Sequence, residues 1–346
     1  MNTRETEEFN MSRDTISIHF VNAALTGVKR LGMDVETLLS HVGIEAELLR
    51  QPKARISPEQ YTRFVKMLWL VTQDEHVGFS PEVRRLGSFT IMCQLIVHAK
   101  TLGAALELST QFYKLFGDDW CVTLERDKHE ARLVPLIPNE QDPDHYMTES
   151  MLMIWHGLAA WLIDRRLPLE RVHLNYPRPQ HADEYDALFF APVIQFDAAR
   201  TEITFAADYL DLPIRQDADS LEEFLKNAPA DLLVKFKNTH SLTSRIREVL
   251  KSQIGEEMPT LNDVASMLYL SPQTLRRRLA AEGKSYQGVK DALRRDAAIH
   301  LLLNPKLTLE DVAQQVGFSE TSTFHRAFKK WTGVTPGLYR QLHGYH

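Results

Sequence analysis

The 346-residue chain is longer than a single hydrophobic core usually supports, so its length suggests about two domains. With 44% hydrophobic and 25% charged residues, the composition is that of an ordinary globular protein, and no apolar run approaches the ~18 residues of a membrane span. The net charge of −6 argues against a nucleic-acid binder, but residues 240–346 carry 15 Lys and Arg against 10 Asp and Glu, whereas the remainder carries 25 against 36. A basic module on an acidic body is expected when only one part of a protein meets phosphates.

Two features of the sequence bear on the compartment. Met1–Asn10 is polar and acidic, and it lacks the basic start and apolar segment of a secretory signal. Cys93 and Cys121, the two cysteines of the chain, are far apart and form no CxxC pattern. Such cysteine usage is typical of a reduced cytoplasm and leaves no cysteine set for a structural zinc site. We therefore expect a cytoplasmic protein without a metal site or a cofactor.

The first 212 residues mix helical and strand-like segments. Ser57-Pro58 predicts a helix start, because serine caps a helix and proline fits its first turn. Periodicity also predicts helices at Asp34–Leu39, Thr101–Phe116 and Met147–Asp164. Strands are predicted at Val172–Tyr176, at Glu202–Phe205, and in a hairpin around Asp127-Lys128 made of Trp120–Arg126 and Ala131–Ile137. No βαβ pattern repeats, so an α+β domain is expected over 1–212.

Residues 213–243 are predicted to connect this domain to the next one. The segment is charged and irregular in period, with Asp217 and Asp219 followed by Glu222 and Glu223. Short helical pieces are expected at 221–226 and 231–236. A C-terminal domain is then expected over 244–346.

An internal repeat is the most informative feature of the C-terminal residues. Leu261-Asn-Asp-Val-Ala265 is echoed by Leu309-Glu-Asp-Val-Ala313, and an apolar residue and a serine follow each at equal spacing. One extra residue then enters the second copy, after which Gly283 corresponds to Gly333. The duplication predicts two copies of one supersecondary unit, at about 259–283 and 308–333.

Each copy has the pattern of a helix-turn-helix, which makes the C-terminal domain all-α. Ala265 and Ala313 are predicted where the two helices cross, because a larger side chain would push them apart. Ser271 and Ser319 are predicted to cap the second helix of each copy. Gly317 supplies a left-handed turn residue at little steric cost, whereas Tyr269 at the equivalent position must be strained or adopt another conformation.

The second helix of each copy is expected to enter the major groove of DNA. Arginine can pair bidentately with guanine and glutamine with adenine, each such pair contributing roughly 1–3 kcal/mol of discrimination. The residues predicted to contact bases are Gln273, Arg276 and Arg277 in the first copy and Thr321, Ser322, His325 and Arg326 in the second. Phosphate contacts position a protein without specifying sequence, and those predicted here are Ser271, Thr274, Arg278, Lys284, Ser319, Lys329 and Lys330.

Between the two copies, Tyr286–Leu303 is predicted to form a long amphipathic helix. A helix of eighteen residues is about 27 Å long, which is close to the length of one turn of B-DNA, about 34 Å. Two recognition helices held this far apart could enter successive major grooves. Arginines on a solvated helix face are the alternative interpretation. Two copies in register, both capped and both followed by glycine, favour DNA binding.

These residues resemble the AraC/XylS family of transcription regulators. The resemblance covers roughly Ser244–Leu342 and is strongest over Val316–Arg340, while Ser271–Gly283 is similar to the subfamily that includes ornithine-utilisation regulators. Upstream, Gly87-Ser-Phe-Thr and the helix from Thr101 look more loosely like the effector-binding and dimerisation domain of that subfamily. The resemblance implies a homodimer formed through the N-terminal domain, with promoter DNA and RNA polymerase as partners. An activator is expected, but the residues leave activation and repression open. It places the family's base-contacting positions on the residues named above.

Other functions fit the sequence less well. HExxH, Gly-x-Ser-x-Gly, P-loop and GxGxxG patterns are all missing, so no enzyme is expected. The cluster His181–Asp186 is either a cation site or a solvated turn. Alkyl-DNA repair proteins carry the same DNA-binding module, but they need four cysteines for zinc and one more as nucleophile. An architectural DNA-binding protein without an effector stays open as an alternative, although about 200 additional residues rich in aromatic helices argue against it.

Aromatic side chains of the first domain either line a small-molecule pocket or belong to its core. The candidates for an effector pocket are Phe89, Phe112, Phe116, Trp120 and Trp155, and Tyr113 and Trp161 accompany them. His156 and Arg126 are candidate polar anchors for the effector. The residues do not indicate which effector or which promoter is recognised.

Overall fold

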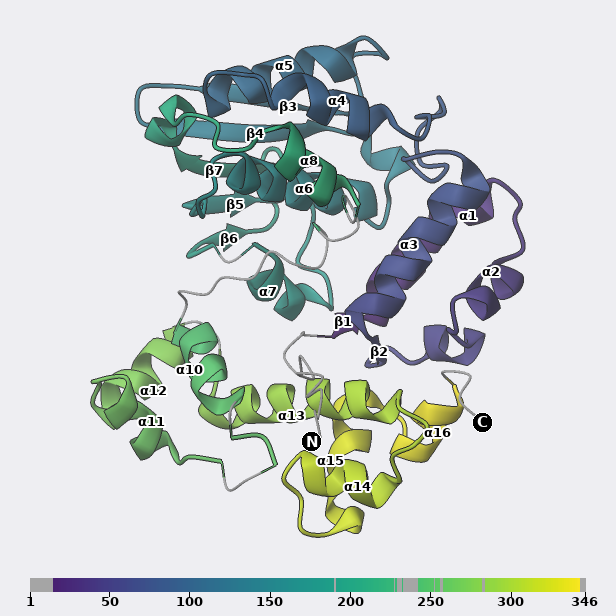
Figure 1. The fold of residues 1–346 in the computed structure, drawn as a ribbon, viewed down its shortest axis with the longest axis vertical. Helices are drawn as coiled ribbons and strands as arrows, with labels where there is room; N and C mark the ends of the chain where they lie inside the picture. The colour runs from purple at the N-terminus through teal and green to yellow at the C-terminus, as the bar shows by residue number, and fades with distance from the viewer. Residues whose placement is uncertain are drawn as a thin grey trace, which may run out of the picture. The chain divides into compact units, whose positions relative to one another are not determined.

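The structure, a computed structural model, describes residues 15–189, 191–226, 228, 232, 242–251, 253–255, 258–281 and 284–342 (Figure 1). These residues form two compact units. The helix-turn-helix unit takes its residues from Met1–Ile18, Leu39–Tyr61 and Thr239–His346, and the sheet unit takes its residues from His19–Leu38 and Thr62–Asn238. The domain boundaries at 212 and 244 expected from the sequence remain predictions.

The sheet unit is built on five strands in the order β3-β4-β7-β5-β6 (Figure 1). Neighbouring strands are antiparallel except for β5 and β6, which are parallel. The hairpin of β3 and β4 turns at Asp127, whose Oδ1 accepts the backbone N–H groups of His129 and Glu130 at 2.9 Å each. The strands are β3 (Cys121–Arg126), β4 (Glu130–Leu136), β5 (Arg171–His173), β6 (Ile194–Gln195) and β7 (Glu202–Ala206).

Helices cover this sheet and complete its core. α5 packs on β3 and α6 packs on β4, and the long α6 is buried over most of its circumference. The helices over residues 15–226, whether or not they touch the sheet, are α1 (Ile18–Arg30), α2 (Val35–His41), α3 (Pro58–Thr72), α4 (Ser88–Ile96), α5 (Leu102–Lys114), α6 (Tyr146–Leu162), α7 (Tyr185–Phe189) and α8 (Ala218–Leu225). Short 3-10 turns of this unit are η2 (Asn139–Gln141), η3 (Ala182–Glu184) and η4 (Ala207–Asp211), whereas η1 (Ala46–Arg50) belongs to the helix-turn-helix unit. None of the helices within the described residues combines the length and apolar content that a bilayer crossing requires.

Most elements predicted for the first domain are confirmed. Ser57 and Gln60 cap each other at the start of α3, with Ser57 Oγ accepting Gln60 N–H at 3.2 Å and Gln60 Oε1 accepting Ser57 N–H at 3.1 Å. Thr101 caps α5 through its side chain. β5 ends at His173, earlier than predicted. Leu174 N–H still donates to Gln195 O of β6 at 2.8 Å, but Asn175 N–H donates to Thr201 Oγ1 at 3.1 Å instead of to a strand. Of the helix predicted over 231–236, all but Leu232 lies outside the described residues.

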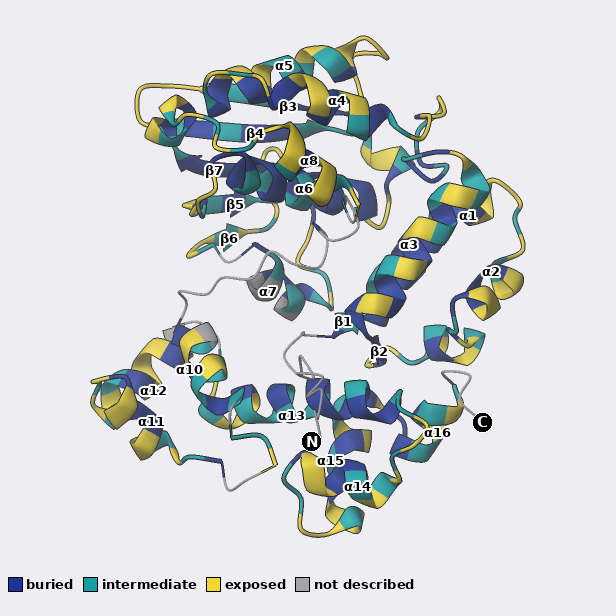
Figure 2. Cartoon of the chain, viewed as in Figure 1, coloured by how far each residue is buried: buried dark blue, intermediate teal, exposed yellow. Residues whose placement is uncertain are grey.

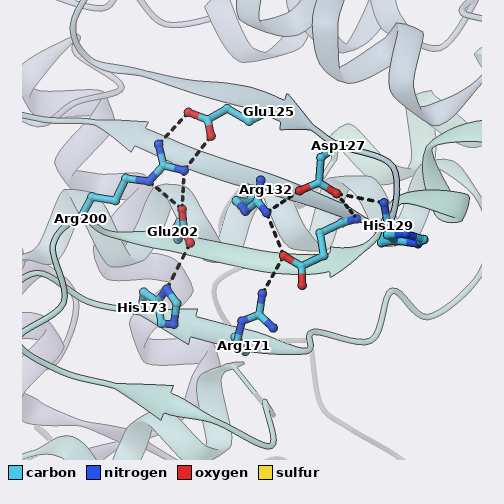
Figure 3. A network of polar contacts seen from close by, with 9 residues as sticks. Glu125, Asp127, His129, Arg132, Arg171, His173, Arg200 and Glu202 are labelled. Carbon is cyan, nitrogen blue, oxygen red and sulfur yellow. Dashed lines mark hydrogen bonds and ion pairs between the residues drawn. The ribbon is translucent and has the colours of Figure 1, made fainter.

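One face of the sheet carries a network of ion pairs (Figure 3). Arg200 binds Glu125 with two guanidinium nitrogens at 2.7 and 2.6 Å and donates from Nε to Glu202 at 2.7 Å. Glu130 accepts from Arg132 at 2.9 Å and from Arg171 at 2.7 Å. Arg200 thus links β3 to β7, and Glu130 links β4 to β5.

The helix-turn-helix unit is all-α apart from one two-stranded ribbon. β1 (Ile16–Ser17) pairs antiparallel with β2 (Arg55–Ile56). The helices are α10 (Leu242–Lys251), α11 (Leu261–Met267), α12 (Pro272–Ala281), α13 (Tyr286–Leu302), α14 (Leu309–Gln315), α15 (Thr321–Thr332) and α16 (Pro336–Gln341). The two predicted helix-turn-helix motifs are therefore α11–α12 and α14–α15, with α13 between them. The expected fold class, α+β followed by an all-α double helix-turn-helix, is confirmed.

Candidate nucleic-acid interface

Both helix-turn-helix motifs begin with the same capping arrangement. In the first, Thr260 Oγ1 accepts the N–H of Asp263 at 3.3 Å, and Asp263 Oδ2 accepts the N–H of Thr260 at 2.8 Å. In the second, Thr308 and Asp311 repeat these bonds at 3.1 and 2.8 Å. Reciprocal caps of this kind satisfy backbone donors that a helix leaves free at its start. The sequence repeat is thus a repeat of local structure.

The turns of the two motifs also match in geometry. Leu270 N–H donates to Ala265 O at 2.8 Å, and Phe318 N–H donates to Ala313 O at 2.9 Å. Each turn passes through one left-handed residue, which is Gly317 with φ 82° in the second motif and Tyr269 with φ 57° in the first. Left-handed backbone costs an ordinary side chain roughly 1–2 kcal/mol. Of the two possibilities left open by the sequence, the first motif therefore has the strained turn.

The start of the second recognition helix differs from the prediction. Ser271 caps α12 as expected, accepting the N–H of Thr274 at 3.1 Å. Ser319 does not cap α15, because the extra residue of the second copy moves the helix start to Thr321 and makes Glu320 the N-cap. Glu320 makes no side-chain cap hydrogen bond. The expectation that Ser319 is a helix cap was wrong.

The inner face of each recognition helix packs into its own core. Leu275 and Leu279 of α12 are buried with Ala265, and Phe324 and Phe328 of α15 are buried with Ala313. Both alanines are almost fully buried. The close approach of the two helices in each motif thus leaves little room for a larger side chain.

The linking helix α13 belongs to both cores. Val289 and Leu293, near its start, are buried with the first motif, whereas Ala297, Ile299 and Leu301 are buried with the second. The helix has 17 residues, one fewer than predicted. At 1.5 Å per residue it spans about 25 Å. A single continuous helix therefore connects the two recognition helices through packed side chains rather than through a loose tether.

Sequence reasoning missed a buried acidic residue in this helix. Asp296 is buried and accepts hydrogen bonds from Thr15 Oγ1 at 2.7 Å, from Arg247 Nη2 at 3.1 Å and from Arg295 Nη2 at 2.9 Å. Burial alone would raise the pKa of Asp296, but the guanidinium groups of Arg295, Arg247 and Arg55 hold that pKa below its usual range. Its partner Arg247 lies on α10, so the pair ties α10 to α13.

The predicted base-contacting residues divide by exposure. Gln273, Arg276 and Arg277 are exposed on α12, and Ser322 and Arg326 are exposed on α15. The alternation of exposed and buried residues around the helices of this unit is visible in Figure 2. Thr321 and His325 are half-buried, and among the described residues His325 Nε2 is a buried nitrogen without a hydrogen-bond partner.

The predicted phosphate-contacting residues are mostly exposed as well. Lys329 and Lys330 lie in the last turn of α15, and Arg278 lies in the last turn of α12. Thr274 and Lys284 are half-buried, and Ser271 Oγ already interacts with Thr274 Oγ1 at 2.8 Å. Arg276, Arg277, Arg278 and Arg326 form no ion pair with an acidic residue of the described chain. Gly283, expected after α12, lies outside the described residues.

The predicted effector-pocket residues fall into two groups. Phe89, Trp120 and Trp155 line one cavity of the sheet unit, together with Tyr113. Phe112 and Phe116 do not line it, since they pack on each other at 5.5 Å between ring centroids, with the Arg84 guanidinium over Phe116. For those two residues the pocket prediction does not hold in this cavity.

The proposed polar anchors are engaged elsewhere, and so is Trp161. His156 Nε2 contacts Leu167 O at 2.7 Å, Arg126 pairs with Asp211 at 2.7 Å, and Trp161 stacks on Phe224 at 4.0 Å. Searched over the described part of the chain, histidine, cysteine, aspartate and glutamate form no group of three or more placed to hold a metal ion.

Comparison with known families assigns both parts of the chain. The family described as the arabinose-binding N-terminal domain of AraC transcription regulators matches residues 32–214, and a helix-turn-helix domain family matches residues 264–342. The chain belongs to the AraC family. It is a DNA-binding transcription regulator, and its N-terminal domain is of a ligand-binding kind that fits effector control.

Some transcription regulators match this chain over nearly their whole length. The ornithine utilization regulator of Pseudomonas aeruginosa is 25% identical over 338 residues, which is 97% of this chain and 99% of that protein. An uncharacterised helix-turn-helix transcriptional regulator of Mycobacterium tuberculosis is 36% identical over 322 residues, covering 89% of this chain and 91% of the relative. The crystal structure of the regulator CdpR from Pseudomonas aeruginosa covers 93% of this chain and 96% of its own at 23% identity, with a TM-score of only 0.32.

Proposed function

We propose that one copy of this AraC-family chain reads two successive major grooves on one face of a promoter, with α12 in one groove and α15 in the next. The observation that carries the proposal is the packing of α13, which contributes buried side chains to both motifs. Its length of about 25 Å suits two reading helices that must lie close to one helical turn of about 34 Å apart.

Base readout is proposed for the exposed polar residues of the two recognition helices. Arg277 and Arg326 are the strongest candidates, because an exposed guanidinium can bind the O6 and N7 atoms of guanine together. Gln273 can bind adenine in the same bidentate way, and Arg276 can bind guanine. Thr321, Ser322 and His325 complete the proposed set at the second helix, with His325 contributing least because its Nε2 is buried.

Phosphate contacts are proposed for the residues that flank the reading faces. Lys329 and Lys330 end α15, and Arg278 lies near the end of α12. Their exposed charges can neutralise phosphates and release condensed counterions, which strengthens binding to every sequence equally. Ser271, Thr274, Lys284 and Ser319 are proposed to add weaker backbone contacts.

The assignment predicts that two kinds of substitution behave differently. Arg277→Ala and Arg326→Ala should each relax the preference at one base pair by roughly 1–3 kcal/mol. Lys329→Ala should weaken binding to all duplexes alike and reduce the salt dependence by about one counterion. Arg245→Ala is a matched control, because Arg245 is exposed on α10 of the same unit but outside both motifs. The measurement is affinity for a selected site and for each of its single-base variants.

An equal loss of affinity for every sequence in all three test variants would show that the base-contacting and phosphate-contacting roles are wrongly assigned. A loss in Arg245→Ala as large as in Arg277→Ala would show that net charge alone explains binding.

We further propose a cytoplasmic homodimer formed through the N-terminal domain, which contacts RNA polymerase and activates transcription without catalysing a reaction. Relatives of the chain include proteins named transcriptional activators, which supports activation. Effector control is proposed to act through the cavity lined by Phe89, Trp120 and Trp155. An architectural protein would have no use for such a cavity. A mass of one chain in light scattering at micromolar concentration would reject the dimer.

A further inference from the structure

The sheet unit contains a cavity whose lining has a distinct chemistry. Its volume is about 70 Å³, and its walls come from α3 and the loop after it, from α4, α5 and α6, and from the start of β3 with the residue before it. The lining residues are Trp69, Glu75, His76, Val77, Phe89, Tyr113, Trp120, Cys121, Tyr146, Met147, Ser150, Met151, Ile154 and Trp155.

Aromatic rings form most of the wall. Trp69, Trp120 and Trp155 are three of the five tryptophans of the chain, and all three line this one cavity. The Tyr113 ring meets Trp155 edge to face at 5.9 Å between centroids. The faces of such rings carry partial negative charge, and they attract organic cations, most strongly at tryptophan.

The charged group in the lining is the carboxyl group of Glu75. Its oxygens accept the N–H of Gly87 at 2.9 Å and the N–H of Phe89 at 3.1 Å, at the start of α4. These two bonds fix the carboxyl group but leave lone pairs unused, since a carboxylate has about four acceptor sites. No lysine or arginine that the structure describes forms an ion pair with Glu75. The cavity therefore presents a carboxyl group without a cationic partner among the described residues.

A basic group that could attract an anion is not part of the lining. Arg84 is 4% exposed and stands over the rings of Phe116 at 4.1 Å and Tyr113 at 5.5 Å, outside the lining residues. His76 does line the cavity, but burial and then the charge of Arg84 lower its pKa to about 3, so its imidazole is neutral. The lining itself thus combines aromatic faces and one acidic group with a neutral imidazole, and the Arg84 charge that acts on Glu75 lies outside it, which favours a cation over an anion.

We infer that this cavity binds a small aliphatic amine in its protonated form, with the ammonium group on Glu75 and between the aromatic rings. The inference rests on the effector role proposed above, because it names the chemical class that the sensor would take. The size of the cavity limits the ligand, since an engineered cavity of about 150 Å³ holds benzene and this one has roughly half that volume. Met147 and Met151 in the wall can adapt to a slightly larger body.

The direct test compares three ligands with one carbon skeleton and different head groups. Propylamine, propan-1-ol and propionate are titrated into the wild-type full chain, and binding is followed by tryptophan fluorescence and by ligand-detected NMR. Propylamine should bind at least tenfold more tightly than propan-1-ol, and propionate should bind most weakly. Equal affinities would reduce the cavity to an apolar void, and tightest binding of propionate would make it an anion site governed by Arg84. Either result overturns the inference.

A variant locates the ammonium group. Glu75→Gln should weaken propylamine binding at least tenfold and leave propan-1-ol unchanged. Glu107→Gln is the matched control, because Glu107 is exposed on α5 of the same unit. Unchanged propylamine binding in Glu75→Gln would contradict the assignment. The wild-type head-group series decides the question even where this variant does not fold.

The pH dependence gives a second readout of the same contact. Burial raises the pKa of Glu75 to about 7, against the hydrogen bonds of Phe89 and Gly87 and the charge of Arg84. Arg84 lowers the pKa of Glu75 and Asp74 raises it, whereas burial raises the pKa of Cys93 and of Tyr113 so that both stay neutral. Propylamine stays protonated between pH 6 and 8, whereas Glu75 loses its proton over that range. The affinity for propylamine should therefore rise with pH. A flat profile would contradict a contact with Glu75.

Measuring DNA affinity with and without ligand separates the class of ligand from effector control. Amine binding without any effect on DNA affinity would leave the ligand class intact and refute effector control. An effect of another ligand class on DNA affinity, with no amine binding, would do the reverse.

Discussion

Replacing Asp296 with asparagine tests whether α13 is held rigidly in its unit. The buried carboxylate accepts from Thr15, Arg247 and Arg295, and a neutral amide in its place would remove the negative charge that the guanidinium groups of Arg247 and Arg295 contact there. Removing one partner of a buried ion pair costs about 3–5 kcal/mol. We expect Asp296→Asn to lower the local unfolding free energy by that amount.

The assay is hydrogen exchange of the α13 amides in the full chain, read by mass spectrometry. A loss of about 3–5 kcal/mol raises the opening population more than a hundredfold, and the exchange of 286–302 should accelerate accordingly. Asp291→Asn is the control on the same helix, because Asp291 is half-buried and contacts Gln287 at 2.7 Å. It should change the free energy by no more than about 0.5 kcal/mol.

The same contacts determine whether the free energy of unfolding rises or falls with pH. The pKa of Asp296 is held below its unfolded value, so its contribution is complete above an unfolded pKa of about 3.9 and is lost as the pH falls through the folded pKa. Asp296→Asn should therefore remove part of the acid destabilisation of the wild-type protein below pH 4. Equal rates of amide hydrogen exchange over α13 in Asp296→Asn and Asp291→Asn would show that these ion pairs do not hold α13 rigidly in its unit.

Three further substitutions probe other features of the fold. Tyr269→Gly should raise the free energy of unfolding by up to about 1 kcal/mol in a denaturant titration, because the 96% exposed tyrosine is held at φ 57°; a loss of stability would contradict a strained turn. Ala313→Leu should lower the free energy of unfolding by about 1–3 kcal/mol, because it overpacks the crossing of α14 and α15. Gln314→Leu, at the exposed neighbouring position, should leave that free energy unchanged. Arg200→Ala should cost less than about 1 kcal/mol despite its short contacts, since the Arg200 and Glu125 side chains are 47% and 43% exposed; a cost above about 2 kcal/mol would mean that the network of Figure 3 acts cooperatively.

The helix-turn-helix unit could be predicted from the sequence because its signals are local. In each copy the repeated leucine, aspartate and valine, the crossing alanine and the turn position lie within about ten residues of one another. The Ser319 prediction failed for an equally local reason, since one inserted residue shifts the helix start to Thr321. Left-handed Tyr269 could be located by alignment to Gly317, but its propensity alone gives no sign of that conformation.

Features that depend on distant residues could not be predicted. Asp296 interrupts an apolar helix face, and only the fold brings Arg247 to it, from 49 residues away. The cavity draws its wall from Trp69 through Trp155, so aromatic content could suggest pocket residues but not which rings face inward. Glu75 carried no sequence signal, because an isolated glutamate in a loop is normally a solvated one.

The spacing of the two half-sites tests the central claim most directly. A high-affinity duplex is selected from random sequence, and five base pairs are then inserted between its two protected half-sites, which turns them to opposite faces of the helix. The rigid α13 predicts that the wild-type chain loses at least about a hundredfold in affinity, since only one recognition helix can then bind, and that a further five base pairs do not restore it fully. Unchanged affinity after the five-pair insertion would contradict one chain reading two adjacent major grooves.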